Sequence, residues 1–392
     1  MSEEVLIMAA RRTPIGAFLG ALSSVHAAQL GAVVTQAVLE DADLAGARLS
    51  EVIFGCVLQA GIGQGPARQA ALGGGVPAGV PTATLNKLCG SGMKAIMLGC
   101  DQIRAGSASV VLAGGLESMS NAPYLLLKAR DGYRMGNDEV FDHMYTDALL
   151  SPYDGKLMGC FADATADRYG FTREQQDAFA AESVKRAVAA ALGSAFCREI
   201  APVTVKDRKG ARSVKRDETP FTCDLAKIPT LRPAFNKSGT VTAATSSSIS
   251  DGAAAVILMA GRVAREHVTK PIARIVAHAS HAQEPEWFTT APVGAIQSVL
   301  ASAGWRPGDV DLYEINEAFA CVTMAAMHDL GLDHRKVNVN GGACALGHPV
   351  GATGARLVAT LIHALDARGL KRGIAALCIG GGEATAIALE RL

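Results

Sequence analysis

The sequence lacks an excess of charge of either sign. Lysine and arginine together number 37, and aspartate and glutamate also number 37, so the formal net charge is zero. A balanced chain creates no long-range field that would attract a polyanion. The composition therefore excludes nucleic acid and anionic membrane surfaces as expected partners.

Closely spaced cysteine pairs and long apolar runs are missing as well. The nine cysteines are scattered with no CxxC, which excludes a disulfide framework and a zinc ribbon, and we expect no metal. No apolar run is long enough to span a bilayer. The acidic start, MSEEVLIM, resembles neither a signal peptide nor a transit peptide. Together with reduced thiols, these absences predict a soluble cytoplasmic protein.

Glycine and apolar residues are abundant instead. The 392 residues include 42 glycines, and 49% of the chain is apolar. This composition is typical of an α/β enzyme with tight turns between strands and helices. The length predicts two domains of ordinary size.

The order of predicted elements occurs twice, which indicates an internal duplication. A strand, a helix and a second strand are expected at residues 5–10, 30–40 and 52–55, and again at residues 273–279, 294–304 and 310–316. Each half continues with a glycine-rich turn, a helix and an apolar strand that ends in glycines. Alternating strands and helices predict parallel or mixed sheets covered by helices.

Cys89 and His348 occupy equivalent turns in the two halves. Cys89 precedes the expected helix at residues 93–106, and His348 precedes the one at residues 355–369. If the halves pack with pseudo-twofold symmetry, the two side chains converge at the shared interface. The sequence between the halves, roughly residues 118–234, follows another pattern and is interpreted as an insertion over one face of the core.

The insertion contains one clear helix and one basic stretch. The helix is expected at residues 172–187, with Thr172 as its N-cap. The basic stretch at residues 206–216 could meet cofactor phosphates. A solvated hairpin turning at Lys209-Gly210 is the alternative interpretation.

Cys89 lies in the motif CGSG at residues 89–92. Free backbone N–H groups and the positive end of a helix dipole lower a thiol pKa, so this position favours a nucleophilic thiolate. The alternative is a buried structural thiol. Flanking glycines favour the nucleophile, because a core cysteine needs no such access to backbone.

His348 has two competing interpretations besides catalysis. It could be a structural residue, or it could share a metal with Cys344, four residues earlier. Gly347 and Pro349 argue against the helix that would align those two side chains. Two loop ligands without a third make a poor zinc site. A rigid loop that presents imidazole to a bound group fits better.

Cys378 and Asn316 follow apolar strands. A core position is the default interpretation for Cys378, but the glycines at residues 380–382 cost chain entropy and need a reason. Their N–H groups are suited to holding an oxyanion. The Asn316 amide could position a water or a carbonyl.

Taken together, the motifs resemble those of the thiolase family, and specifically its biosynthetic branch. The resemblance runs from RTPIG at residues 12–16 nearly to the C-terminus. Its motifs are CGSG at 89–92, AGGLESMS at 113–120, NEAFA at 316–320, GHP at 347–349, GATGAR at 351–356 and CIGGG at 378–382.

The resemblance implies an α/β, thiolase-like fold. Two duplicated βαβαβαββ halves would stack in α/β/α/β/α layers, with an inserted loop domain. The implied boundaries are residues 1–117 for the first part of the N-terminal half, 118–245 for the loop domain, 246–269 for the end of that half, and 270–392 for the C-terminal half.

The resemblance also implies ping-pong acyl transfer between acyl-CoA molecules. Cys89 would carry the acyl group, with His348 accepting its proton, and Cys378 would remove a proton from acetyl-CoA. His348 and a water on Asn316 would form one oxyanion hole, and the N–H groups of Cys89 and Gly380 the other. The thiol of Cys378, where decarboxylating relatives have a second histidine, favours non-decarboxylating chemistry.

Coenzyme A would be a substrate, and no further cofactor would be needed. The enzyme would be a homodimer or a homotetramer and would act in fatty acid metabolism. The implied contacts to substrate and coenzyme A are Ser247, Phe235, Ala318, Phe319, Leu157 and Met158. The chain departs from the family pattern at Leu157, Thr245, Glu383 and Ala384. A degradative 3-ketoacyl-CoA thiolase and a non-catalytic acyl-CoA or lipid-binding protein are the alternatives.

Overall fold

Strands from both halves of the chain form one mixed sheet in the computed structural model, which describes residues 3–207 and 210–392. The strand order is β12-β13-β14-β11-β1-β10-β5-β3-β4, with β2 paired to β10. The bounds are β1 (Val5–Arg12), β2 (Gly16–Ala17), β3 (Glu51–Gly55), β4 (Thr82–Leu85), β5 (Val110–Ser118), β10 (Ser250–Ala260), β11 (Ala273–Ala282), β12 (Leu312–Ile315), β13 (Arg372–Ile379) and β14 (Glu383–Arg391).

The order is symmetric about the junction of β1 with β11, which confirms the internal duplication. On one side β10, β5 and β3 follow β1, and on the other side β14, β13 and β12 follow β11. β3 and β5 are parallel, as are β12 and β13, whereas β10 and β14 run antiparallel to their neighbours. Among the described residues, the counterpart of β4 is reduced to a single bridge between Tyr313 and Val337.

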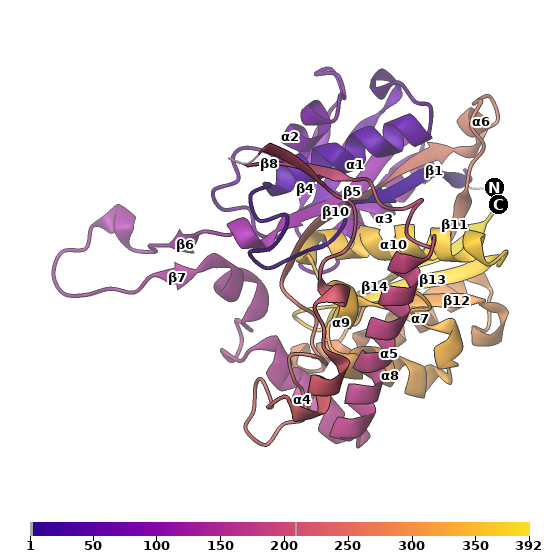
Figure 1. Cartoon of the computed structure of the whole chain (residues 1–392). Coiled ribbons are helices and arrows are strands. Elements are labelled where there is room, and N and C mark those ends of the chain that lie inside the picture. Colours follow the sequence, from indigo (N-terminus) through magenta and orange to yellow (C-terminus); the bar gives the residue numbers. More distant parts are fainter. Residues whose placement is uncertain (1–2, 208–209) are drawn as a thin grey trace.

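Helices divide the molecule into the expected five layers (Figure 1). Helices α3 (Ser91–Ala105) and α10 (Val350–Ala367) pack on each other between the two halves of the sheet. Helices α1 (Ala27–Asp41) and α2 (Pro66–Gly73) cover the outer face of the N-terminal half, and α7 (Ala291–Ala303) and α8 (Ala320–Leu330) that of the C-terminal half.

Glycines allow the two central helices to approach closely near their N-termini. A Cβ atom on Gly92 would lie 2.9 Å from the carbonyl oxygen of Gly351, and one on Gly354 would lie 2.4 Å from the backbone nitrogen of Met93. Neither space admits a side chain. The turns that precede α3 and α10 are therefore held together across the interface between the halves.

The inserted segment supplies two further helices, α4 (Met158–Tyr169) and α5 (Arg173–Leu192). The predicted capping box of α5 is present, with the Gln175 N–H donating to Thr172 Oγ1 at 3.2 Å. The helix continues five residues beyond the expected end. None of the described helices combines the length and the apolarity needed to cross a membrane.

The basic stretch is a hairpin, as the alternative interpretation proposed. Strands β8 (Val203–Asp207) and β9 (Gly210–Val214) pair antiparallel, and β8 packs on the outer N-terminal layer. Arg208 and Lys209, at the expected turn, lie outside the described residues.

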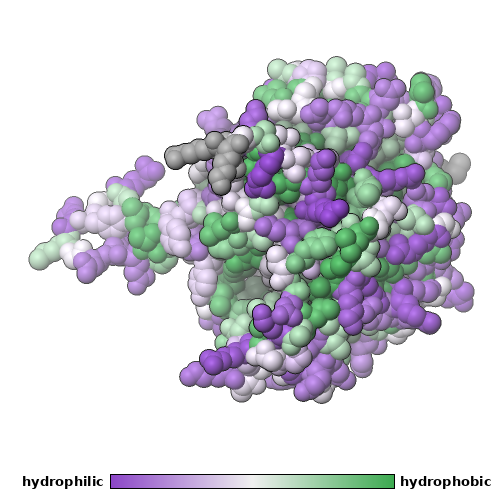
Figure 2. Space-filling view, viewed as in Figure 1, coloured by the Kyte–Doolittle hydropathy of each residue, from purple (hydrophilic) through white to green (hydrophobic). Residues whose placement is uncertain are grey.

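A long arm extends from the body at strands β6 (Tyr124–Leu125) and β7 (Phe141–Asp142) (Figure 1). It carries apolar residues among polar ones on its surface (Figure 2). Among them, Leu126, Leu127 and Met135 are exposed.

Candidate active site

One cavity of about 310 Å3 brings together the glycine-framed residues of both halves. It is lined by ten of the residues singled out from the sequence, which are Cys89, Leu157, Met158, Phe235, Ser247, Ala318, Phe319, His348, Cys378 and Gly380. Asn316 does not line it and lies fully buried at the end of β12. Residues as far apart in the sequence as Leu88 and Gly380 thus meet at one site.

The Cys89 turn is held by hydrogen bonds on both sides of the thiol. The Ser91 hydroxyl donates to the carbonyl of Leu88 at 2.6 Å and accepts from the Lys87 N–H at 2.8 Å. The Leu88 N–H donates to Asn86 Oδ1 at 2.8 Å. Leu88 has a φ of 47°, a region that L residues rarely occupy and that recurs at functional sites. The turn presents Cys89 to the cavity immediately before α3.

His348 is oriented by Thr353, one turn into α10. The Thr353 hydroxyl lies 2.7 Å from His348 Nδ1 and 2.9 Å from the carbonyl oxygen of Pro349. The Thr353 hydroxyl donates its proton to the Pro349 carbonyl, and its oxygen can then accept a hydrogen bond from His348 Nδ1–H. This arrangement assigns the proton to Nδ1. Nε2, which bonds no protein atom in the described part of the chain, is then the basic nitrogen.

Cys378 is the penultimate residue of β13 and is 1% exposed. The glycines that follow have two separate functions. Gly381 and Gly382 have φ values of 88° and 90°, so the turn into β14 requires glycine there. The N–H groups of Gly380 and of Cys89 itself face the Cys89 sulfur and favour its charged form. Two backbone donors therefore converge beside the thiol.

Asn316 is buried without a protein partner for either amide atom, among the residues that the structure describes. Its backbone N–H donates to the carbonyl of Ala376 at 3.0 Å and fixes the residue at the sheet edge. Buried amides almost always have hydrogen-bond partners. The Asn316 side chain is therefore suited to holding an ordered water.

Comparisons with known proteins show the family of the chain. Residues 5–262 match the family described as Thiolase, N-terminal domain, and residues 269–391 match Thiolase, C-terminal domain. The chain belongs to the thiolase family. An acetyl-CoA acetyltransferase of Cupriavidus necator is 47% identical over 390 residues, which cover 99% of each chain.

Solved thiolase structures have the same fold over the whole chain. The acetyl-CoA acetyltransferase of Bacillus anthracis superposes with a TM-score of 0.97 at 40% identity, covering 100% of this chain and 99% of that one. The thiolase Acat5 of Ascaris suum, in complex with coenzyme A, gives 0.94 at 41% identity, covering 99% and 100%.

The protonation state of this thiolase differs from the one expected from the Cys89 turn alone. Burial raises the pKa of the Cys89 thiol to about 11, although the N–H groups of Gly380 and Cys89 oppose the shift. The prediction of a lowered pKa is therefore wrong, because burial disfavours the thiolate more than the local dipoles favour it. Burial, followed by the charge of Arg356, lowers the pKa of His348 to about 3. The resting pair is a thiol and a neutral imidazole.

Burial also raises the pKa of the Cys378 thiol well above its usual range, and the nearby Cys89 adds to the shift. At neutral pH both cysteines of this thiolase are thus protonated. Cys378 can donate a proton to a carbanion and can take one back when it is a thiolate.

Glu117 has a role that the sequence did not reveal, although it lies in the AGGLESMS motif. Its buried carboxylate accepts N–H groups from Val57 at 3.0 Å, Leu58 at 3.1 Å and Gly351 at 2.9 Å. It therefore joins the His348 turn to the loop after β3. Thr353 and Val350, which follow His348 closely in the chain, were also missed. The apolar wall residues Tyr145, Ala148, Leu149, Ile249 and Phe288 were missed because only the tertiary fold brings them to the cavity.

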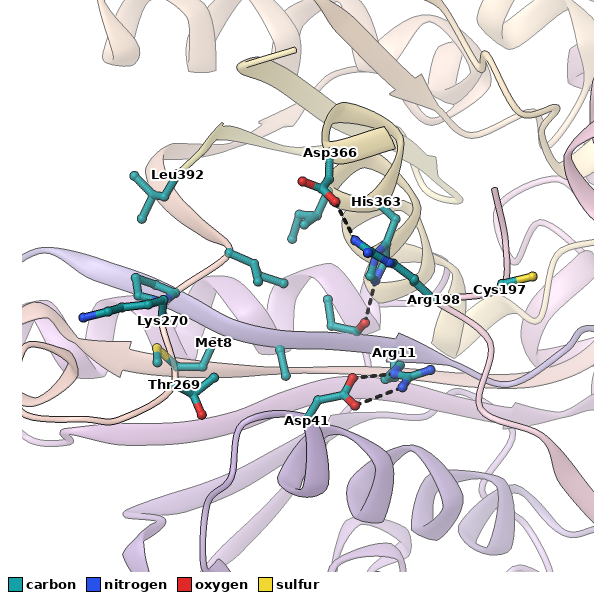
Figure 3. Close-up of a pocket in the computed structure, with 15 residues that line it drawn as sticks. Met8, Arg11, Asp41, Cys197, Arg198, Thr269, Lys270, His363, Asp366 and Leu392 are labelled. Atoms are coloured by element: carbon teal, nitrogen blue, oxygen red, sulfur yellow. Dashed lines mark hydrogen bonds and ion pairs between the residues drawn. The ribbon is translucent and has the colours of Figure 1, made fainter. Parts of the chain in front are cut away.

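A larger cavity, of about 580 Å3, lies between β1, α10 and the C-terminus (Figure 3). Four of its charged groups form two ion pairs, Arg11 with Asp41 at 2.9 Å and Arg198 with Asp366 at 3.0 Å. It contains none of the residues that thiolase chemistry uses.

Proposed function

We propose that this thiolase is an acetyl-CoA acetyltransferase, which condenses two acetyl-CoA molecules reversibly to acetoacetyl-CoA and coenzyme A. The observation that carries the proposal is the convergence of Cys89, His348, Cys378 and Gly380 on one cavity. The names of its relatives, acetyl-CoA acetyltransferases over their full length, support it. Coenzyme A is a substrate, and the family needs no other cofactor.

In the first half-reaction, Cys89 Sγ attacks the carbonyl carbon of acetyl-CoA as its proton passes to His348 Nε2. The tetrahedral oxyanion accepts hydrogen bonds from the N–H groups of Cys89 and Gly380. It then collapses, the C–S bond to coenzyme A breaks, and the leaving thiolate takes the proton from His348. Acyl-Cys89 and free coenzyme A result.

In the second half-reaction, Cys378 passes its proton to His348 Nε2 and, as a thiolate, removes a proton from the methyl carbon of another acetyl-CoA. The protonated Nε2 of His348 and a water held by Asn316 donate hydrogen bonds to the enolate oxygen. The carbon attacks the thioester on Cys89, the C–S bond to Cys89 breaks with acetoacetyl-CoA formed, and the leaving sulfur takes the proton from His348. In thiolysis Cys378 acts instead as the acid that protonates the departing enolate, for which its raised pKa is suited.

The lowered pKa of His348 predicts an acylation rate that is insensitive to mild acid. A histidine lowered from 6.5 to about 3 stays neutral, and hence basic, as the pH falls from about 8 to about 5. Acylation of Cys89 by acetyl-CoA, followed by rapid quench and mass spectrometry, should remain level over that range. A fall centred near the ordinary histidine pKa would show that the base is solvated or is another group. Far-UV circular dichroism at each pH is the control.

We propose a short acyl chain as the preferred substrate. Three aromatic rings, those of Phe235, Phe288 and Phe319, line the cavity and belong to the same apolar cluster as Cys378. Longer chains would have to displace them. We expect kcat/KM for thiolysis of acetoacetyl-CoA to exceed that of 3-ketooctanoyl-CoA about tenfold or more, since overpacking costs about 1–3 kcal/mol.

Kinetics with a series of chain lengths test this proposal directly. Equal kcat/KM values across the series would favour the broad degradative thiolase. Absence of thiolysis at every length would favour the non-catalytic binding protein. In Phe288→Ala, where a ring that is 3% exposed is removed, the preference for the short chain should shrink.

We also propose a homotetramer, or a homodimer as its unit, in the cytoplasm. The exposed Leu126, Leu127 and Met135 of the arm, which are 52%, 60% and 99% exposed, support a contact with further copies of the chain. Light scattering should give about four times the mass of one chain. A monomer at micromolar concentration would contradict this proposal.

A further inference from the structure

The turns that contain Cys89 and Cys378 belong to different halves and pack directly on each other. A Cβ atom on Gly90 would lie 2.3 Å from Ile379 Cδ1, and one on Gly380 would lie 3.6 Å from Leu88 Cδ1. Each turn supplies one N–H group to the Cys89 sulfur, from Cys89 and from Gly380. The spacing of these two donors therefore depends on how one turn sits against the other.

An ion pair closes the contact at its outer edge. Lys87, two residues before Cys89, bonds through Nζ to the carboxylate of Glu383. Glu383 is the first residue of β14 and pairs in register with Ile379 of β13. The two side chains are 23% and 38% exposed.

Several hydrogen bonds anchor each turn within its own half. The Lys87 N–H and the Leu88 carbonyl bond to Ser91, and the carbonyl of Gly382 accepts from the Gln283 N–H at 2.8 Å. Between the two turns, the other contacts are the packing of small and apolar groups and the approach of the Gly380 N–H to the Cys89 sulfur. The Lys87–Glu383 pair adds a charged contact that resists displacement of one turn along the other.

We propose that Lys87 and Glu383 are positioning residues for the oxyanion hole formed by the N–H groups of Cys89 and Gly380. The Lys87–Glu383 ion pair holds the two turns together. It thereby keeps the two N–H donors at the separation that a tetrahedral oxyanion requires. Stabilisation of this kind depends on placement of the donors to within a fraction of an ångström. A partly exposed pair contributes little to global stability, so its effect should appear in turnover. The inference rests on the proposed thiolase reaction.

The test compares the single neutral variants Lys87→Gln and Glu383→Gln with the reversed pair Lys87→Glu/Glu383→Lys. We expect each single change to lower kcat for thiolysis of acetoacetyl-CoA about tenfold, a fraction of the loss of a whole oxyanion donor. KM for coenzyme A should change less than about twofold, and the melting temperature should stay level. The reversed pair should recover most of the lost kcat.

Salt supplies a second readout. Because dissolved salt screens an exposed ion pair, the wild-type kcat should fall with added sodium chloride toward the kcat of the single variants. The kcat of the single variants should change little with salt. Asp333→Asn is the matched control, since it removes the carboxylate of another exposed ion pair, with Arg335, in the same half. This control should leave kcat and its salt response unchanged.

The outcomes distinguish the positioning role of the Lys87–Glu383 pair from the thiolase reaction on which it rests. Wild-type enzyme without thiolysis activity would refute the proposed function. Two results with an active wild-type enzyme would refute the positioning role alone. One is an unchanged kcat in both single variants, and the other is a kcat of the reversed pair that is no higher than that of the single variants.

Discussion

Replacing Cys89 by serine is expected to lower kcat/KM for thiolysis of acetoacetyl-CoA about ten-thousandfold or more. The hydroxyl nearly matches the thiol in shape but is a far weaker nucleophile, and loss of a nucleophile removes most of the rate enhancement of such enzymes. Because His348 is neutral at rest, the variant retains its base but has no thiol to activate. Mass spectrometry after incubation with acetyl-CoA should show no acyl adduct.

Cys197→Ser is the matched control for this change. Cys197 is an exposed thiol remote from the cavity, so its replacement should leave both the rate and the acyl adduct at wild-type levels. Full thiolysis by Cys89→Ser, with the Cys197 control also active, would eliminate Cys89 as the nucleophile. An adduct on another residue would assign that role elsewhere.

Replacing Cys378 by serine should separate the two half-reactions. Acylation of Cys89 by acetyl-CoA involves no carbon acid, so it should stay within about tenfold of wild type. Condensation and thiolysis should both fall about a thousandfold, because a serine hydroxyl is a poor acid and base toward carbon. Acylation is measured by mass spectrometry, and exchange of the acetyl-CoA methyl protons with deuterium by NMR. Exchange should be lost with condensation.

A matched buried cysteine is available beside Cys378. Cys321 belongs to the same apolar cluster, and its thiol donates to the carbonyl of Ala162 at 3.5 Å, so a serine there finds an acceptor. Cys321→Ser should keep condensation near the wild-type level. If acylation itself disappeared in Cys378→Ser while Cys321→Ser stayed active, Cys378 would belong to the first half-reaction rather than to the second.

Burial of the cavity has two consequences for catalysis. Burial keeps Cys89 and Cys378 as thiols and His348 as a neutral base. Exclusion of water also strengthens the hydrogen bonds from the N–H groups of Cys89 and Gly380 to a developing oxyanion. The thiols are therefore activated only when substrate and imidazole are in place, which limits side reactions of a free thiolate.

Much of the fold followed from the sequence, because strands and helices depend on local patterns. The apolar run at residues 5–10 became β1, and the glycine-framed turns marked the starts of α3 and α10. The repeat of these patterns predicted that Cys89 and His348 would meet. That inference needed only the duplication and the tendency of duplicated units to pack symmetrically.

Local patterns could not predict the balance of effects on each buried group. The turn before α3 indicated a lowered thiol pKa for Cys89, whereas burial in the folded protein raises it. The partners of the Glu117 carboxylate lie 59 to 234 residues away, and no spacing in the sequence relates them.

The sequence by itself determined the chemical groups of this thiolase: two thiols, an imidazole, an amide and backbone donors on glycine-rich turns. Only the tertiary structure decided their protonation, the basic nitrogen of His348 and the contact of Lys87 with Glu383. The physical reason is that the chemical group of each side chain depends only on the identity of its own residue. Dielectric surroundings and hydrogen-bond partners, by contrast, come from segments that meet only when the two halves close on each other.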